Sequence, residues 1–190
     1  MLFDVHVDEL NKKVMGVLMF LNRVSEHFDK TTRIIVVQSL VLSLINYCIS
    51  IWGGTCKTLL HNVQKLQNFA AKVAIGGARK YDHATPFIKE LKWLTINDKY
   101  IFEKCTTVYK AVHGLYPDWY IKFPTVSERA ASITRQENNL HIPRAKTDSG
   151  ARATTICGPR FWNNLPHYTR SSLSLHSFKS SLLNVFLKDS

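Results

Sequence analysis

The chain of 190 residues has few acidic side chains and no cluster of them. Asp and Glu number 14 against 25 Lys and Arg, and no two aspartates are adjacent in the sequence. Two-metal nucleotidyl transfer needs grouped carboxylates to hold both ions. A recognisable polymerase metal site is therefore excluded, and we predict no catalytic residue and no metal ligand.

The cysteine and histidine spacings of known sites are also missing. The four cysteines are Cys48, Cys56, Cys105 and Cys157. They form no close pair, and no two of the eight histidines lie four residues apart, so neither a zinc site nor a disulfide framework is indicated. Asp82-His83 lacks a third catalytic partner and is interpreted as a turn. We predict no cofactor and, without a signal peptide or glycosylation sequon, an intracellular location.

The shortage of acids leaves a formal net charge of +11, with 21% charged and 45% hydrophobic residues. Such a composition supports one core, or one core with an appendage. The charge favours a polyanionic partner, either nucleic acid or an anionic membrane surface. A protein whose basic charge is incidental is the alternative at this point.

The stretch Ile34 to Trp52 contains no charged residue. It is long enough to span a membrane. Polar residues nevertheless recur along it at steps of three to five, from Gln38 to Ser50, and collect on one side of a helix. The opposite face is apolar: Ile34, Val37, Val41, Leu44, Ile45, Cys48 and Trp52. With Asp29 as N-cap and Gly53-Gly54 as the end, we predict a buried soluble helix and no membrane contact.

Two further helices are predicted on either side of this one. Apolar residues at steps of three and four predict a helix from about Val5 to His27 and another from Lys57 to Ala74, which ends at Gly76-Gly77. With the uncharged helix innermost, residues 5–80 are expected to form a three-helix bundle. The stretch from Lys57 to Lys80 contains five basic residues and no acid.

Lys65, Lys72 and Arg79 are seven residues apart and project together if that helix continues, accompanied by Gln64, Gln67 and Asn68. Such a face suits contacts to phosphates. A solvated outer face with no ligand explains the spacing equally well.

Residues 81–121 are predicted to form a helical extension. Thr85-Pro86 indicates an N-cap followed by the first turn of a short helix, and a second helix is predicted from about Asn97 to Gly114. Aromatic residues gather near its end: Tyr109, Tyr116, Trp119 and Tyr120. Stacking on bases is one interpretation, and packing in the core is the one we favour.

The rest of the chain is less regular. We predict a loop-rich or short-strand segment at 122–168, with a small hairpin or irregular extended chain between Leu140 and Thr155, and an interruption at Gly158-Pro159. A C-terminal helix is predicted within 169–188, capped by Ser174 or Ser177. The predicted fold class is therefore mainly α.

Several stretches, taken in order, resemble the carboxy-terminal part of reverse transcriptases from non-LTR (LINE-type) retrotransposons of the jockey and related groups. Two elements are fairly specific, Tyr-Cys-x3-Trp-Gly from Tyr47 and Trp-Asn-x-Leu-Pro from Trp162. The resembling stretches are SLVLSLINYCISIWGG (39–54), VQKLQNFAAKVAIGG (63–77), DHATPFIKELKWL (82–94), VYKAVHGLYPDWY (108–120), IPRAKTDSGAR (142–152), GPRFWNNLP (158–166) and SLHSFKSSL (174–182).

The resemblance implies that residues 5–80 correspond to the helical thumb, which grips the primer–template duplex, and that the remainder is the family's carboxy-terminal extension. The palm with its paired aspartates, the endonuclease domain and the zinc knuckle of that family are missing. We therefore expect a non-catalytic fragment that retains at most binding to an RNA or DNA duplex through its backbone. The predicted nucleic-acid-binding residues are Lys65, Lys72, Arg79, Lys80, Arg144, Arg152 and Arg160.

Two alternatives stay open. In one, the chain is a helical protein-interaction module in which the Trp162 region and the last helix dock onto a partner. In the other, the chain is a remnant with no selected function.

Overall fold

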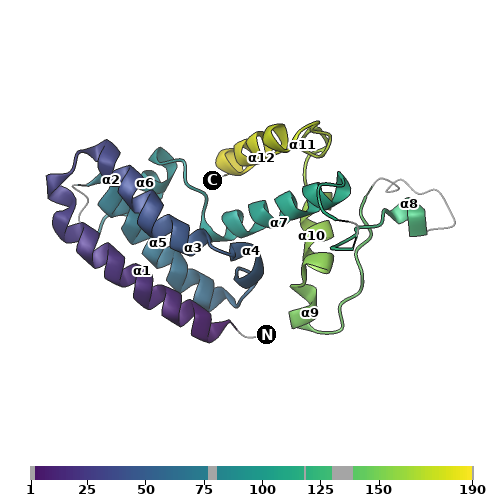
Figure 1. Cartoon of the computed structure of the whole chain (residues 1–190), viewed down its shortest axis with the longest axis horizontal. Helices are drawn as coiled ribbons and strands as arrows, with labels where there is room; N and C mark the ends of the chain where they lie inside the picture. Colours follow the sequence, from purple (N-terminus) through teal and green to yellow (C-terminus); the bar gives the residue numbers. More distant parts are fainter. Residues whose placement is uncertain (1–2, 77–80, 118, 130–138, 190) are drawn as a thin grey trace. The chain divides into compact units, whose positions relative to one another are not determined.

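A computed structural model of the chain describes residues 3–76, 81–117, 119–129 and 139–189. The fold is mainly helical, as predicted, and the β pairing within the described residues is an isolated bridge between Thr125 and Leu140 (Figure 1). The chain divides into two compact units, one ending at Tyr100 and the other running from Ile101 to Asp189. The segment boundaries predicted after residues 80, 121 and 168 stay predictions.

The first unit opens with α1 (Asp4–Val24), followed by the short turn η1 (Ser25–His27). The predicted apolar stripe is present in α1, and Val7 extends it by one more turn. The buried residues of α1 are Val7, Leu10, Val14, Leu18 and Leu21. Because these positions repeat every three or four residues, one side of α1 faces the core and the other faces solvent.

Asp29 begins the next helix, α2 (Lys30–Val37), and is the N-cap that the sequence predicts. Its carboxylate accepts from the backbone N–H groups of Thr31 and Thr32 at 3.0 and 3.2 Å. The hydroxyl of Thr32 also donates to this carboxylate. These bonds favour the charged form, so the pKa of Asp29 lies below its usual value.

The uncharged stretch does not form the single helix that the sequence predicts. After α2 comes a wide π-type turn, η2 (Gln38–Leu42), then α3 (Ser43–Asn46) and α4 (Ile49–Trp52). Between the last two, Cys48 takes the left-handed conformation with φ 52°. This break lets the indole of Trp52 donate to the carbonyl of Tyr47 at 2.8 Å while Trp52 stays buried. Cys48 is consequently exposed, whereas it was predicted on the apolar face.

Helix α5 (Lys57–Ile75) packs against α1, α2 and α6 (Thr85–Glu90) (Figure 1). Contrary to the prediction, the uncharged stretch is not innermost, because one of its sides is exposed. Its polar side and several apolar side chains face solvent, among them Ile35, Leu40 and Tyr47. Small side chains explain the central place of α5, since Ala70, Ala71 and Ala74 are buried and allow close approach of other helices.

Two predicted helix starts shift by one residue. Helix α6 begins at Thr85 itself, so the residue before it, Ala84, is the N-cap and Pro86 lies in the first turn. Helix α7 (Ile96–Val112) begins after Thr95, whose hydroxyl accepts from the N–H of Asp98 at 3.2 Å. Such shifts are common because helix ends fray.

In the second unit the predicted interruption at Gly158-Pro159 is wrong, because both residues lie within α10 (Thr154–Asn163) and are buried. A Cβ added at Gly158 would lie 2.8 Å from a methyl of Val108. Close packing of α10 on α7 therefore requires glycine at position 158. This packing also stabilises α10, although Pro159 removes one of its backbone hydrogen bonds.

The segment 122–168 is more helical than predicted. It contains the short helices α8 (Val126–Arg129) and α9 (Asp148–Ala151) as well as α10, and no hairpin is found among its described residues 140–155. Leu140 is instead held by the side-chain amide of Asn163, which accepts from its N–H and donates to its carbonyl, both at 2.9 Å.

The chain ends with α11 (His167–Arg170), after Pro166, and α12 (Leu175–Asp189). Ser174 caps α12 as predicted, because its hydroxyl accepts from the N–H of Ser177 at 3.1 Å. Of the helices in the described ranges, none combines the length and the apolar character that crossing a membrane requires.

The two faces of α3 predict opposite responses to a new charge. Ile45 is fully buried and Ser43 is exposed. Ile45→Asp places a carboxylate in the core and should lower the free energy of unfolding of the first unit by about 3 kcal/mol or more. Ser43→Asp should change it by about 0.5 kcal/mol or less. Equal melting temperatures of the two variants would contradict this assignment of faces.

Candidate nucleic-acid interface

The outer face of α5 carries basic side chains and no acid. Lys57, His61, Lys65, Asn68 and Lys72 follow one another at steps of four, four, three and four residues, which places them on one side of a helix. The first three are exposed, and the last two are partly buried. At 1.5 Å per residue, the row is about 22 Å long. We call these five residues the α5 basic row.

The buried side of α5 fixes the direction in which this row points. The apolar residues predicted along one side of this helix, its seam, are Leu59, Val63, Leu66, Ala70 and Val73. The last four are buried against the first unit's core, and Leu59 is partly buried. Since the basic row lies opposite the seam on the helix, packing of the seam turns the lysines toward solvent.

Gln64 and Gln67 do not belong to the outer face, contrary to the prediction. The side chain of Gln67 is buried, and its amide donates to the carbonyl of Leu94 at 2.8 Å. The Gln64 carbonyl accepts from the N–H of Ile96, and its amide donates to Gln67 and Asn68, each at 2.9 Å. Both glutamines therefore fasten α5 to the segment that leads into α7, where they satisfy otherwise buried backbone groups.

Arg79 does not extend the row along α5. The helix ends at Ile75, and Gly76 follows with φ 76°, a left-handed conformation that favours glycine. Arg79 and Lys80 themselves lie outside the described residues. Of the predicted binding residues, the structure thus brings Lys65 and Lys72 onto one face.

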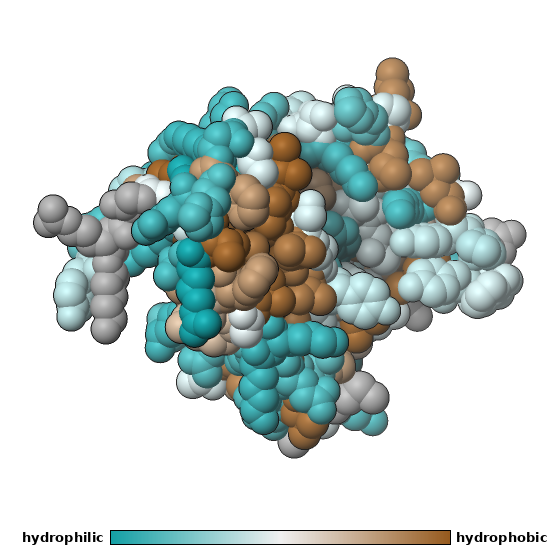
Figure 2. Space-filling view, turned by 60° about the vertical axis from the view of Figure 1, so that its left-hand side comes forward, coloured by the Kyte–Doolittle hydropathy of each residue, from teal (hydrophilic) through white to brown (hydrophobic). Residues whose placement is uncertain are grey.

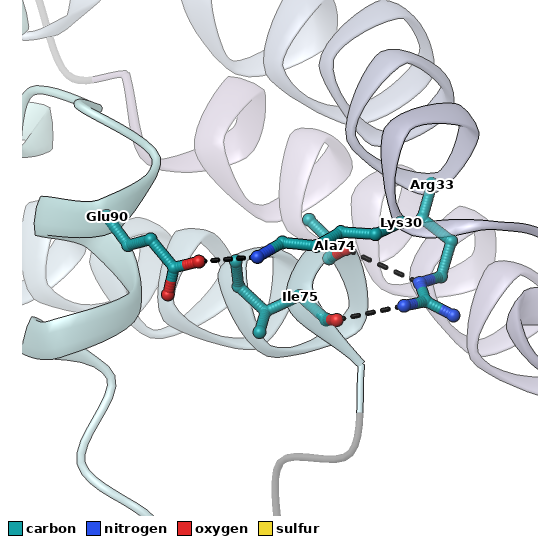
Figure 3. A network of polar contacts seen from close by, with 5 residues as sticks. All are labelled: Lys30, Arg33, Ala74, Ile75 and Glu90. Carbon is teal, nitrogen blue, oxygen red and sulfur yellow. Dashed lines mark hydrogen bonds and ion pairs between the residues drawn. The ribbon is translucent and has the colours of Figure 1, made fainter.

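Arg33 of α2 holds the end of α5 in place (Figure 3). Its guanidinium donates to the carbonyls of Ile75 and Ala74 at 2.9 and 3.5 Å. Nη1 of the same guanidinium donates to the carbonyls of Phe28 and Ser25 at 3.0 and 3.3 Å. The last carbonyls of a helix lack partners within the helix and carry its partial negative charge, so a cation there is stabilising.

Gly76 leaves the space that this guanidinium occupies. A Cβ added at Gly76 would lie 2.7 Å from Nη2 of Arg33. Both the backbone conformation and the close approach of Arg33 therefore exclude a side chain here.

Lys30 lies one turn before Arg33 and pairs with Glu90 of α6, with Nζ 2.6 Å from Oε1 (Figure 3). About half of each side chain is exposed, at 53% and 50%. Water and salt screen such pairs, which contribute at most about 1 kcal/mol. The guanidinium of Arg33, with four carbonyl partners, is the stronger connection.

Cys56 is the N-cap residue of α5. Its Sγ lies 3.1 Å from the hydroxyl of Thr58. Hydrogen bonding by this hydroxyl lowers the pKa of the Cys56 thiol. The two buried thiols, Cys105 and Cys157, lie in the second unit, and burial raises the pKa of Cys105 to about 12.

Arg144, Arg152 and Arg160 belong to the second unit and are exposed. Arg152 donates from Nε to the carbonyl of Asp148 at 3.1 Å, a bond within its own short helix. The assignment of these three arginines to nucleic-acid binding stays a prediction.

Lys104 is a buried cation that the sequence did not single out. Its Nζ lies 2.5 Å from the hydroxyl of Thr154, and burial lowers the pKa of Lys104. Within the described part of the chain, no group of three or more His, Cys, Asp or Glu side chains is placed to hold a metal ion. The candidate site in the first unit is the α5 basic row.

The aromatic residues near the end of α7 separate into two groups. Tyr109 is buried, as the favoured core interpretation predicts, whereas Trp119 and Tyr120 are exposed. Tyr116 is only partly buried. The residue types alone do not distinguish the buried ring from the exposed ones.

Comparison with protein-family models, with curated proteins and with solved structures finds no match for this chain. The resemblance to non-LTR reverse transcriptases is therefore a prediction that depends on the sequence stretches quoted above.

Removing the Arg33 guanidinium should destabilise the first unit. Arg33→Met keeps an aliphatic stem but leaves the carbonyls of Ala74 and Ile75 without this donor, so urea denaturation should show a loss of about 2–4 kcal/mol. The matched control is Lys30→Met on the same helix, which should cost about 1 kcal/mol or less. Losses of equal size would show that Arg33 is no more than a surface cation.

The thiols should react in two classes. In the native protein, Cys48 and Cys56 should react rapidly with an aromatic disulfide at pH 8, while Cys105 and Cys157 should react only after unfolding, because the first pair is exposed and the second buried. The lowered pKa of Cys56 should place the midpoint of its pH–rate profile below that of an unstructured cysteine peptide. Thr58→Val should raise that midpoint, and an unchanged profile would refute the contribution of the hydroxyl.

Proposed function

We propose that this chain binds the phosphate backbone of a nucleic-acid duplex through the α5 basic row and has no catalytic activity of its own. The observation that carries the proposal is the face itself, on which Lys57, His61, Lys65 and Lys72 are collected without a single acidic residue in α5. Each lysine that contacts a phosphate releases condensed counterions, which favours binding irrespective of base sequence.

The rigidity of α5 supports the same proposal. Its C-terminal end is held by Arg33, and its inner side is held by the glutamines and by the buried seam. A row of charges on a helix that does not reorganise loses little entropy when it meets a regular array of phosphates. A row about 22 Å long spans several phosphates of one strand.

The origin of the chain is part of the proposal. We infer that it is the carboxy-terminal, thumb and post-thumb region of a non-LTR retrotransposon reverse transcriptase without the palm. Residues of the two most specific resembling motifs make packing contacts and hydrogen bonds within the fold, as expected of a non-catalytic segment. Trp52 is buried, Gly53 lies against the ring of Tyr100, and Asn163 holds Leu140. A coding sequence with paired aspartates directly upstream would support this origin.

A protein-interaction module is the second candidate, and one observation favours it. In the view that brings the α1 and α2 side forward, apolar side chains form a band bordered by hydrophilic ones (Figure 2). Exposed apolar residues of these helices include Phe20 at 61% and Ile35 at 57%, and exposed patches of this kind often mark interfaces. Trp162 and Phe178 are buried, so these two side chains are not available to a partner. Docking through the rest of the last helix stays a prediction.

Neutralising the basic row should weaken duplex binding and reduce its salt dependence. In the triple variant Lys57→Gln, Lys65→Gln and Lys72→Gln, the stems remain and the charges are lost. The slope of log K against log salt for an RNA–DNA hybrid duplex should decrease by about 0.9 for each phosphate contact removed.

The matched control removes the same charge from α1, through Lys12→Gln, Lys13→Gln and Arg23→Gln. These exposed residues share their helix with Asp4, Asp8 and Glu9. The control should leave the slope nearly unchanged. Equal slopes for the two triple variants would mean that binding depends on net charge alone, and the proposed interface would be wrong.

A further inference from the structure

A group of aromatic rings lies in the second unit after the end of α7, with Trp119 and Tyr120 exposed and Tyr116 partly buried. Tyr116 and Tyr120 have ring centroids 4.8 Å apart, and the ring of Trp119 meets that of Tyr120 edge-on, at 6.2 Å and 83°. Trp119 is 83% exposed and Tyr120 is 54% exposed. We call these three residues the aromatic platform.

Backbone turns place the platform outside the core. Gly114, with φ 65°, ends the helical conformation after α7, and the N–H of Leu115 returns to the carbonyl of Lys110 at 2.8 Å. The N–H of Tyr120 then bonds to the carbonyl of Pro117 at 2.9 Å, which closes a second turn. The rings are thus carried on two consecutive turns that have their own hydrogen bonds.

The exposure of Trp119 is unlike that of the other tryptophans. Trp52, Trp93 and Trp162 are 1%, 8% and 5% exposed. The core of the second unit has its own group of aromatic rings. Tyr109 stacks on Phe178 with centroids 4.4 Å apart and also contacts Trp162. The platform therefore contributes nothing to that stack. A large aromatic surface left in water is informative about binding.

The sequence around the rings contains two lysines, Lys110 and Lys122, and one acid, Asp118. Nζ of Lys110 lies 5.6 Å from the centre of the Tyr116 ring, a cation–π distance. Lys122 is exposed two residues after Tyr120. Rings with free faces beside cations match a ligand that alternates flat bases with phosphates. An apolar protein surface would leave these cations without a counterpart.

We propose that the aromatic platform stacks unpaired bases of single-stranded nucleic acid. In a duplex the bases are already stacked and paired, so the platform selects strands whose bases are free. This site goes beyond the proposed function, because it lies in the other unit and recognises bases where the α5 basic row recognises phosphates.

The fluorescence of the full chain tests this proposal directly. Because the other three tryptophans are buried, the red-shifted, collisionally quenchable emission belongs to Trp119. Titration with a short single-stranded oligonucleotide of mixed sequence should quench this emission and protect it from iodide. An abasic oligonucleotide with the same number of phosphates should bind more weakly and leave the emission nearly unchanged.

Variants separate stacking from charge. Trp119→Ala should weaken single-strand binding roughly fivefold or more, measured by fluorescence anisotropy of a labelled oligonucleotide, and Trp119→Phe should restore most of the affinity because it keeps a ring. Tyr120→Ala should also weaken binding. Its matched control is Tyr168→Ala, another exposed tyrosine of the second unit (64% exposed), which should have no effect.

The outcomes distinguish this site from the α5 basic row. If the triple lysine variant loses duplex binding while Trp119 is never quenched, the platform proposal is wrong and the duplex proposal stands. If the triple lysine variant still binds duplex normally and Trp119 is still quenched by the single strand, the duplex proposal is wrong and the platform proposal stands. Equal binding of the abasic and the normal oligonucleotide would overturn base stacking. Protection of Trp119 that depends on protein concentration alone would also overturn it, and would identify a contact between two copies of the chain.

Discussion

The first unit depends on the contact between the Arg33 guanidinium and the carbonyls at the ends of two helices. Ser25 and Phe28 lie where α1 gives way to α2, and Ala74 and Ile75 close α5. One side chain thereby satisfies acceptors from segments more than 40 residues apart in sequence, since Arg33 and Ile75 are separated by 42 positions. Charged hydrogen bonds in a partly buried place are stronger than the exposed pair of Lys30 and Glu90, so this contact stabilises the end of α5 that Gly76 makes possible.

The position of α5 in turn explains how one helix serves both folding and binding. Its seam packs on α1 and α2, and its glutamines bond to Leu94 and Ile96. The remaining side carries the lysines. The glutamines thus satisfy backbone groups of the following segment without any charge on the inner side of α5. Lys57 and Lys65 lie on the exposed side, which is the arrangement that contact with phosphates requires.

In the second unit the same separation applies to aromatic residues. Tyr109 donates its hydroxyl to the carbonyl of Ser172 at 2.9 Å and stacks on Phe178 inside the core. The rings after α7 are held by turns and remain in solvent. Buried tyrosines need a partner for the hydroxyl, and Tyr109 has one. An exposed ring keeps its faces available for a ligand, so the two groups suit different purposes although they are close in sequence.

The sequence by itself determined the features that depend on local interactions. The mainly helical class, the stripes of α1 and α5, and the caps at Asp29 and Ser174 follow from side-chain spacing and from hydrogen bonds within a few residues. The lysines of α5 were predicted on one face for the same reason. Tertiary structure alone decided the rest: the break at Cys48, the passage of α10 through Pro159, the burial of Gln67 and the exposure of Trp119. These depend on which distant groups come into contact, such as Val108 with Gly158, and a local pattern contains no information about such partners.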